Sequence, residues 1–171
     1  MMAYWPSEML PCWNLNLPTE LTVKDYGTVD EHQISPETRQ KLVDTARVAA
    51  LNAYVPYSHF PVGAAVLTDA GDIVAGVNIE NASFGLTVCG ERVAIQTAAA
   101  MGHRSIVAIA VSAPRAAGTT PCGACRQVMN EFKPAEGDLL VLLDLHDSFL
   151  AIPFSDLLPK AFGPRDLELT V

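Results

Sequence analysis

Residues 105–113 read SIVAIAVSA, a short and continuously apolar segment. A strand with one solvated face alternates apolar and polar residues, whereas this segment presents apolar side chains to both faces of a sheet. Residues 138–145, DLLVLLDL, have the same character. Two strands buried on both faces require covering layers on both sides. The sequence therefore predicts an α/β fold with helices on both faces of a sheet.

The segments before residue 105 supply a helix and a hairpin. ISPETRQKLVDTARVAALNAYVPYS (34–58) predicts a helix that Ser35 caps, that has Pro36 in its first turn, and that Pro56 ends. VGAAVLTDAGDIVAGVNI (62–79) predicts two strands, 62–68 and 73–79, joined by a turn at Ala70–Gly71.

The remaining segments alternate helices and strands. Helices are predicted from Cys89 to about Met101 and from Cys122 to about Phe132, a fifth short strand at 148–154, and one helical turn at 155–164. Strand–helix–strand crossovers predict parallel neighbouring strands in a mixed sheet. Residues 34–171 are expected to form one domain, preceded by an irregular extension, 1–33, with little periodicity.

Composition narrows the class of protein. The chain has 171 residues, a formal charge of −8 and only 11 scattered Lys and Arg residues, which argues against binding of a nucleic-acid polymer. It has no apolar run long enough for a membrane span, and its first residues lack the features of a secretion signal. We therefore expect a cytoplasmic protein that acts on a small molecule.

Three of the four cysteines lie in two motifs, TVCGERVAI (87–95) and TTPCGACRQ (119–127). Cys122 and Cys125 share one face of a helix at i and i+3, and Cys89 stands where another helix begins. Three protein ligands with an open fourth position are typical of catalytic zinc. No histidine stands at ligand spacing from these cysteines, so we expect water in the fourth position.

Charged residues beside the cysteines suggest how such a site would work. Glu91 lies two residues after Cys89, where a carboxylate can take a proton from a metal-activated water. Arg92 and Arg126 each follow a motif residue directly and could donate hydrogen bonds to thiolate sulfurs. In their simplest structural roles, Glu91 would favour a helix start and Arg126 would be a surface arginine.

Two other uses of the cysteines remain open. PCGAC (121–125) also fits a thioredoxin-like redox pair, which would leave Cys89 and Glu91 without a role. A purely structural zinc would need a fourth Cys or His at matching spacing, which is missing.

Four stretches together carry a resemblance to a known family: PYSHFPVGAAVLT (56–68), GVNIENASFGLTVCGERVAI (76–95), TTPCGACRQVMNEF (119–132) and LLPKAFGPRDL (157–167). Glu91 followed by Pro-Cys-x-x-Cys matches the zinc deaminase signature in its three-cysteine form. Over residues 36–168 the chain resembles the small homotetrameric cytidine deaminases. The resemblance implies a three-layer α-β-α fold with a mixed five-stranded sheet.

The same resemblance implies hydrolytic deamination of cytidine and 2′-deoxycytidine in pyrimidine salvage. It assigns zinc to Cys89, Cys122 and Cys125, and proton transfer to Glu91. In the family pattern Phe60 packs on the base, the Gly90 N–H faces the base carbonyl, and Asn78 and Glu80 hold the ribose 3′-hydroxyl. Phe162 matches an aromatic residue that a neighbouring subunit lends to the pocket.

Three features depart from the family pattern: Gly90 replaces the usual Ala, Phe84 stands where Tyr is common, and the 1–33 extension has no counterpart in short members. These departures leave the preferred nucleoside open, with a modified cytosine nucleoside such as blasticidin S as an alternative substrate. A non-catalytic, zinc-stabilised assembly module is the alternative from another class, and the presence of Glu91 argues against it.

Overall fold

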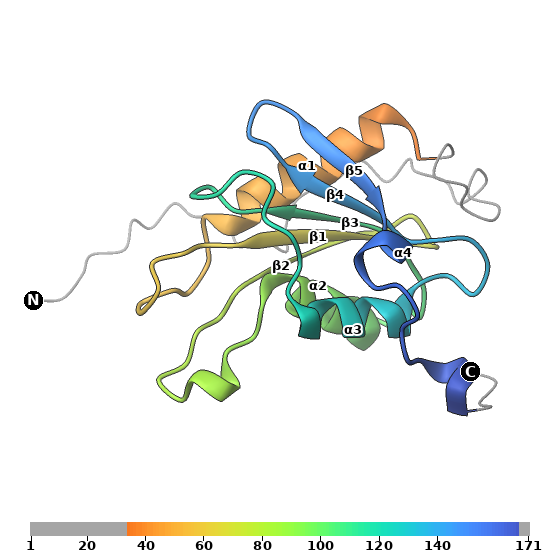
Figure 1. Cartoon of the computed structure of the whole chain (residues 1–171). Coiled ribbons are helices and arrows are strands. Elements are labelled where there is room, and N and C mark those ends of the chain that lie inside the picture. Colours follow the sequence, from red (N-terminus) through yellow and green to blue (C-terminus); the bar gives the residue numbers. More distant parts are fainter. Residues whose placement is uncertain (1–33, 168–171) are drawn as a thin grey trace, which may run out of the picture.

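The structure is a computed structural model that describes residues 34–167 (Figure 1). The predicted 1–33 extension, with Cys12, lies outside the described residues. The elements follow the predicted order of helices and strands. They are α1 (Pro36–Ala50), β1 (Gly63–Thr68), β2 (Ile73–Val77), η2 (Phe84–Leu86), α2 (Gly90–Ala100), β3 (Ile106–Ser112), α3 (Gly123–Phe132), β4 (Leu140–Asp144), β5 (Phe149–Pro153), α4 (Phe154–Leu157) and η3 (Pro164–Leu167). Between residues 34 and 167, no helix is long and apolar enough to cross a membrane.

The five strands form one mixed sheet in the order β2-β1-β3-β4-β5. β3 and β4 are parallel, and the other neighbouring pairs are antiparallel. Helix α1 lies on one face of the sheet, whereas α2 and α3 lie side by side on the other, which confirms the three layers (Figure 1). The expectation of parallel neighbours was wrong for β2 and β3, because β1 pairs with both of them and separates them.

The two faces of the sheet bury separate apolar clusters. Side chains from alternate positions of β3 enter both clusters: Ile109 packs toward α2 and α3, and Ala110 toward α1. Every residue of β1, β3 and β4 is buried. The continuous apolar character of residues 105–113 is thus explained by burial on both sides.

Helix α1 begins as predicted and ends earlier than predicted. Ser35 Oγ accepts a hydrogen bond from the Thr38 N–H at 3.2 Å, as an N-cap does. The helix stops at Ala50, six residues before Pro56. The cause is tertiary: Tyr54 forms an isolated bridge with Ile79, so its backbone is recruited to the end of β2.

Helix α2 packs unusually close to the hairpin at Gly76. A Cβ at Gly76 would overlap the backbone N of Ala94 and would lie 2.5 Å from the carbonyl oxygen of Gly90. Both atoms belong to the backbone of α2, so neither can rotate away. The glycine thereby sets the distance of α2 from the sheet, and α2 carries Glu91 in its first turn.

Gly76→Ala should therefore destabilise the fold by about 1–3 kcal/mol, the usual cost of forcing a methyl group into a packed interior. Urea unfolding would measure the free energy of unfolding. Gly85→Ala is the matched control, since a Cβ at Gly85 meets nothing within 4 Å. Its effect should stay within about 0.5 kcal/mol. Equal stability of the two variants would contradict the close packing of α2.

Candidate active site

The three cysteines of the sequence motifs meet where two helices begin. Cys89 is the N-cap residue of α2 and Cys122 that of α3, and neither side chain caps its own helix. Cys125 lies in the first turn of α3 and is fully buried. Both helices direct the positive ends of their dipoles at this point, which favours thiolate over thiol.

The sulfur atoms are spaced as ligands of one metal ion. Cys122 Sγ lies 3.3 Å from Cys125 Sγ and 3.8 Å from Cys89 Sγ, and all three sulfurs lie within 4.8 Å of one another. Sulfurs of a tetrahedral zinc site lie about 3.8 Å apart, given a Zn–S distance of about 2.3 Å. A disulfide would need about 2.05 Å. Three soft sulfur donors in this arrangement fit zinc.

Two of the thiols, Cys89 and Cys125, differ in how readily they lose a proton. A hydrogen bond from Cys125, with further help from Arg92, lowers the pKa of Cys89 to about 5. The pKa of Cys125 is raised, because its proton is held by the Cys89 sulfur and because the thiol is buried beside Glu91. Without a cation, Cys89 and Cys125 therefore share one proton, and only Cys89 is readily ionised. A divalent metal would remove that restriction.

Glu91 lies against the sulfur cluster and away from bulk water. Its side chain is 4% exposed, and its carboxyl group lies beside the Cys89 and Cys125 sulfurs. Burial raises the pKa of Glu91, and the negative charge of Cys89 raises it further. A carboxyl group with a raised pKa takes up a proton more readily than a free glutamate does, which suits a role in proton transfer.

The two arginines proposed to bond thiolates differ in the structure. Arg92 donates to the Thr87 carbonyl at 2.9 Å and to Cys89 Sγ at 3.8 Å. Arg126 instead donates to the carbonyl oxygens of Pro121 and Leu157, each at 2.8 Å. Arg126 thus fixes the loop before Cys122 and joins it to α4, through backbone oxygens rather than through sulfur.

Gly90 is the first residue of α2 and is buried. N–H groups in the first turn of a helix have no partner within that helix, so they are available to a bound molecule. A Cβ at Gly90 would lie 3.0 Å from the Val62 carbonyl oxygen and 3.3 Å from the Asn78 nitrogen. Glycine therefore relieves a tight contact between α2 and the hairpin.

Asn78 fixes the segment that carries Phe60. Its Oδ1 accepts from the Val62 N–H at 2.9 Å, and its Nδ2 donates to the Phe60 carbonyl at 2.9 Å. The carboxamide therefore bridges two backbone groups on either side of Pro61. One N–H of the amide and one lone pair of its oxygen remain for a ligand.

Glu80 holds the neighbouring part of the same loop. Its Oε2 accepts from the backbone N–H groups of Tyr57 and Ser58 at 3.0 and 3.2 Å. Hydrogen bonds from Ser58 and Tyr57 lower the pKa of Glu80, which keeps it ionised. The structure thus joins the Asn78-Ile79-Glu80 stretch to the Phe60 loop.

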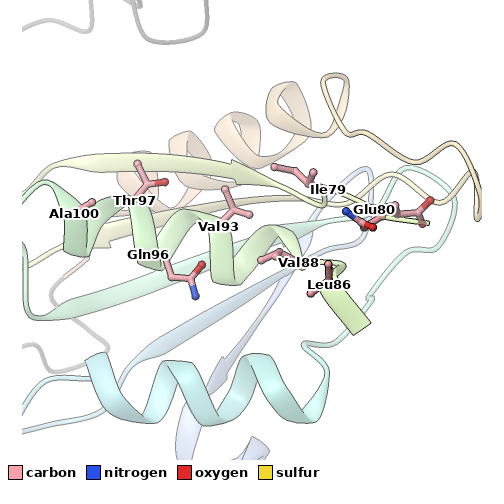
Figure 2. Close-up of a pocket in the computed structure, with 9 residues that line it drawn as sticks. Ile79, Glu80, Leu86, Val88, Val93, Gln96, Thr97 and Ala100 are labelled. Atoms are coloured by element: carbon pink, nitrogen blue, oxygen red, sulfur yellow. The ribbon is translucent and has the colours of Figure 1, made fainter. Parts of the chain in front are cut away.

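A hollow of about 370 Å³ begins at Glu80 and follows the outer surface of α2 (Figure 2). Figure 2 shows Val93, Gln96, Thr97 and Ala100 along the helix, with Ile79, Val88 and Leu86 near its start. The residues that line it include none of the three cysteines and not Glu91. The lining is mainly apolar, and Leu86 is 66% exposed.

Phe162 lies on the segment that connects α4 to η3, and its side chain is 61% exposed. The Phe162 carbonyl accepts hydrogen bonds from two side chains of α3, Gln127 and Asn130. The sequence analysis missed both residues. Their spacing of three fits any helix face, so no local pattern distinguishes them.

The sequence of this chain matches a known family and several known proteins. Residues 36–137 match the model of the cytidine and deoxycytidylate deaminase zinc-binding region. A cytidine deaminase of Halalkalibacterium halodurans is 49% identical over 130 residues, which span 76% of this chain and 98% of that protein. A cytidine deaminase of Mycobacterium tuberculosis is 43% identical over 122 residues, 71% of this chain and 87% of that protein.

Solved structures give the same relationship. The crystal structure of cytidine deaminase from Burkholderia pseudomallei superimposes with a TM-score of 0.67 at 43% identity, covering 72% of this chain and 98% of that one. The cytidine deaminase structure from Mycobacterium tuberculosis has a TM-score of 0.63 at 41% identity, covering 72% and 96%. The predicted three-layer fold is therefore confirmed.

Proposed function

The chain belongs to the cytidine and deoxycytidylate deaminase family, and on that premise we propose that it deaminates cytidine and 2′-deoxycytidine hydrolytically, with zinc as cofactor. The observation that carries this function is a buried carboxyl group, Glu91, that lies beside a cluster of three thiols. A redox pair would use only Cys122 and Cys125. A purely structural zinc would have no use for a buried acid.

The metal would be held by Cys89, Cys122 and Cys125. Zinc with three protein ligands supplies Lewis-acid activation of a water, whose pKa falls to about 7 in catalytic sites. The reaction forms a C4–O bond on the cytosine ring and breaks the bond from C4 to the exocyclic nitrogen. Water and cytidine thereby become uridine and ammonia.

Glu91 moves the protons of this reaction. It would take one proton from the water and deliver it to ring N3, and would then pass the remaining proton, from the hydroxyl group added at C4, to the departing amine. Its burial suits the first step, because a raised pKa makes the carboxylate a stronger proton acceptor. Arg92 offsets part of the negative charge of the thiolates through its bond to Cys89.

The loop and helix ends around the thiols would orient the substrate. The Gly90 N–H would face the carbonyl of the base, and the Phe60 ring would pack on its face. Asn78 and Glu80 each retain hydrogen-bonding atoms for the ribose 3′-hydroxyl after fixing the loop.

The proposal includes a cytoplasmic homotetramer in which Phe162 of one subunit completes the pocket of another. Two exposed apolar side chains on the short helix η2, Phe84 at 74% and Leu86 at 66% exposed, support assembly, and Phe162 is 61% exposed on a separate segment. Large apolar groups gathered at a surface commonly mark a protein contact. The apolar hollow on α2 adds to that surface.

Loss of the cytosine absorbance would test the function directly. Purified protein should convert cytidine and 2′-deoxycytidine, release one ammonia per turnover and contain zinc. Blasticidin S in a parallel assay tests the alternative substrate, which the ribose-binding pair Asn78 and Glu80 disfavours. Turnover of blasticidin S alone would correct the substrate, and zinc content with no turnover of any of the three would favour the non-catalytic assembly module.

A further inference from the structure

The backbone of Phe162 is fixed by two amide side chains that converge on one atom. Gln127 Nε2 and Asn130 Nδ2, one turn apart on α3, each donate to the Phe162 carbonyl oxygen at 3.0 Å. A carbonyl oxygen has two lone pairs, so these bonds use its full acceptor capacity. Gln127 is exposed, whereas Asn130 is only 6% exposed.

The residue after Phe162 is fixed as well. A Cβ at Gly163 would lie 2.6 Å from Asn130 Nδ2, so the chain crosses directly over the carboxamide. The Gly163 N–H donates to Asp166 Oδ2 at 2.6 Å, and the Asp166 N–H returns a bond to the Gly163 carbonyl at 2.9 Å. The backbone around residue 162 is thus held on both sides.

The backbone of Phe162 is fixed, whereas most of its ring is exposed to solvent. Burying a polar side chain such as Asn130 destabilises the fold unless the side chain is hydrogen-bonded. Here its hydrogen bond holds the backbone of an exposed apolar residue. Such an arrangement fits a side chain that must project in one direction toward a partner. Ordering it in advance lowers the entropy cost of docking.

We infer that Asn130, assisted by Gln127, is a positioning residue that presents the Phe162 ring to the substrate site of a neighbouring copy of the chain. The inference rests on the shared site of the proposed function. Helix α3 then has two roles. Its N-terminal end supplies Cys122 and Cys125 to the site of its own subunit. Its later turns hold the backbone of Phe162, whose ring enters the site of a neighbouring subunit.

Kinetics of Asn130→Ala and Phe162→Ala, alone and combined, test the inference. Asn130→Ala should raise KM for cytidine about three- to tenfold, the effect of one lost hydrogen bond. The double variant should have the KM of Phe162→Ala alone, because Asn130 acts only through the ring. Multiplied effects in the double variant would overturn the inference.

Mixed assemblies separate a role in the neighbouring site from a role in the residue's own site. Asn130→Ala subunits mixed with inactive Glu91→Gln subunits should regain a component with the original KM. In such assemblies, an intact ring from the Glu91→Gln subunit faces an intact Glu91. If the raised KM persists, Asn130 acts within its own subunit, and the inference fails.

A second mixture, of Phe162→Ala subunits with Glu91→Gln subunits, tests the shared site itself. It distinguishes a wrong role for Asn130 from a wrong assignment of the Phe162 ring to a neighbouring subunit. If mixing restores neither variant, although Phe162→Ala alone raises KM, then the ring serves its own subunit and the shared site is wrong. Gln127→Ala, at an exposed position, repeats the test if Asn130→Ala folds poorly; it should raise KM only when Phe162 is present. Glu131→Ala, exposed on the same helix, is the control and should keep the original KM.

Discussion

Glu91→Gln should lower kcat for cytidine by about 10²- to 10⁴-fold, the usual contribution of a general acid–base group. That loss corresponds to about 3–5 kcal/mol of activation free energy. Glutamine has nearly the size of glutamate and fits the same buried space, but it cannot take a proton from water. Because Glu91 is 4% exposed, no bulk water can replace it as the proton carrier.

Steady-state kinetics and zinc analysis of the same preparation would measure this result. Zinc content and assembly should match the original protein, since Glu91 is not among the three sulfur ligands. Glu131→Gln makes the same chemical change on an exposed surface and should leave kcat unchanged. Full activity of Glu91→Gln would exclude Glu91 as the proton carrier.

Cys122→Ser should remove zinc and, with it, deaminase activity. The substitution takes away a sulfur that lies 3.3 and 3.8 Å from the other two. Cys122 is the N-cap residue of α3, and serine is a better N-cap residue than cysteine. The helix itself is therefore not weakened, and the loss can be assigned to the metal.

Thermal melting and metal analysis would follow the change. Zinc at 100 times its Kd stabilises a protein by about 2.7 kcal/mol, which corresponds to about 5–10 °C in Tm for a chain of this size. Ala124→Ser is the matched control, because it adds a hydroxyl in the same exposed turn and keeps both thiols. One zinc per chain in Cys122→Ser would contradict the ligand assignment.

Most of the fold could be predicted because apolar periodicity and helix caps are local. The cap at Ser35, the helix start at Cys122 and the turn at Gly71 each depend on a few adjacent residues. The end of α1 could not be predicted in this way. Pro56 was the local stop signal, but the pairing of Tyr54 with Ile79 ends the helix at Ala50.

In the candidate site, too, local motifs could be predicted, whereas contacts between residues distant in sequence could not. Cys89, Glu91, Cys122 and Cys125 were identifiable because the motifs place ligand and acid at fixed spacings. The direction of the Arg126 guanidinium depends on Pro121 and Leu157, and Leu157 lies 31 residues away in sequence. The bond from Asn130 to Phe162 spans 32 residues and ends on a backbone oxygen. Every residue has such an oxygen, so the type of residue at position 162 does not reveal the bond.

The bonds that Asn78 and Glu80 make to the Phe60 loop have a consequence for the affinity of the site for a nucleoside. Every donor and acceptor in these bonds belongs to the chain itself, so folding orders the loop without help from a nucleoside. Ordering a flexible segment would cost roughly 1–2 kcal/mol per residue in backbone entropy. The entropy of ordering the Phe60 loop is already part of the folding free energy. It therefore does not reduce the affinity for the nucleoside. The site is therefore pre-organised, and it resembles a rigid receptor more than a closing lid.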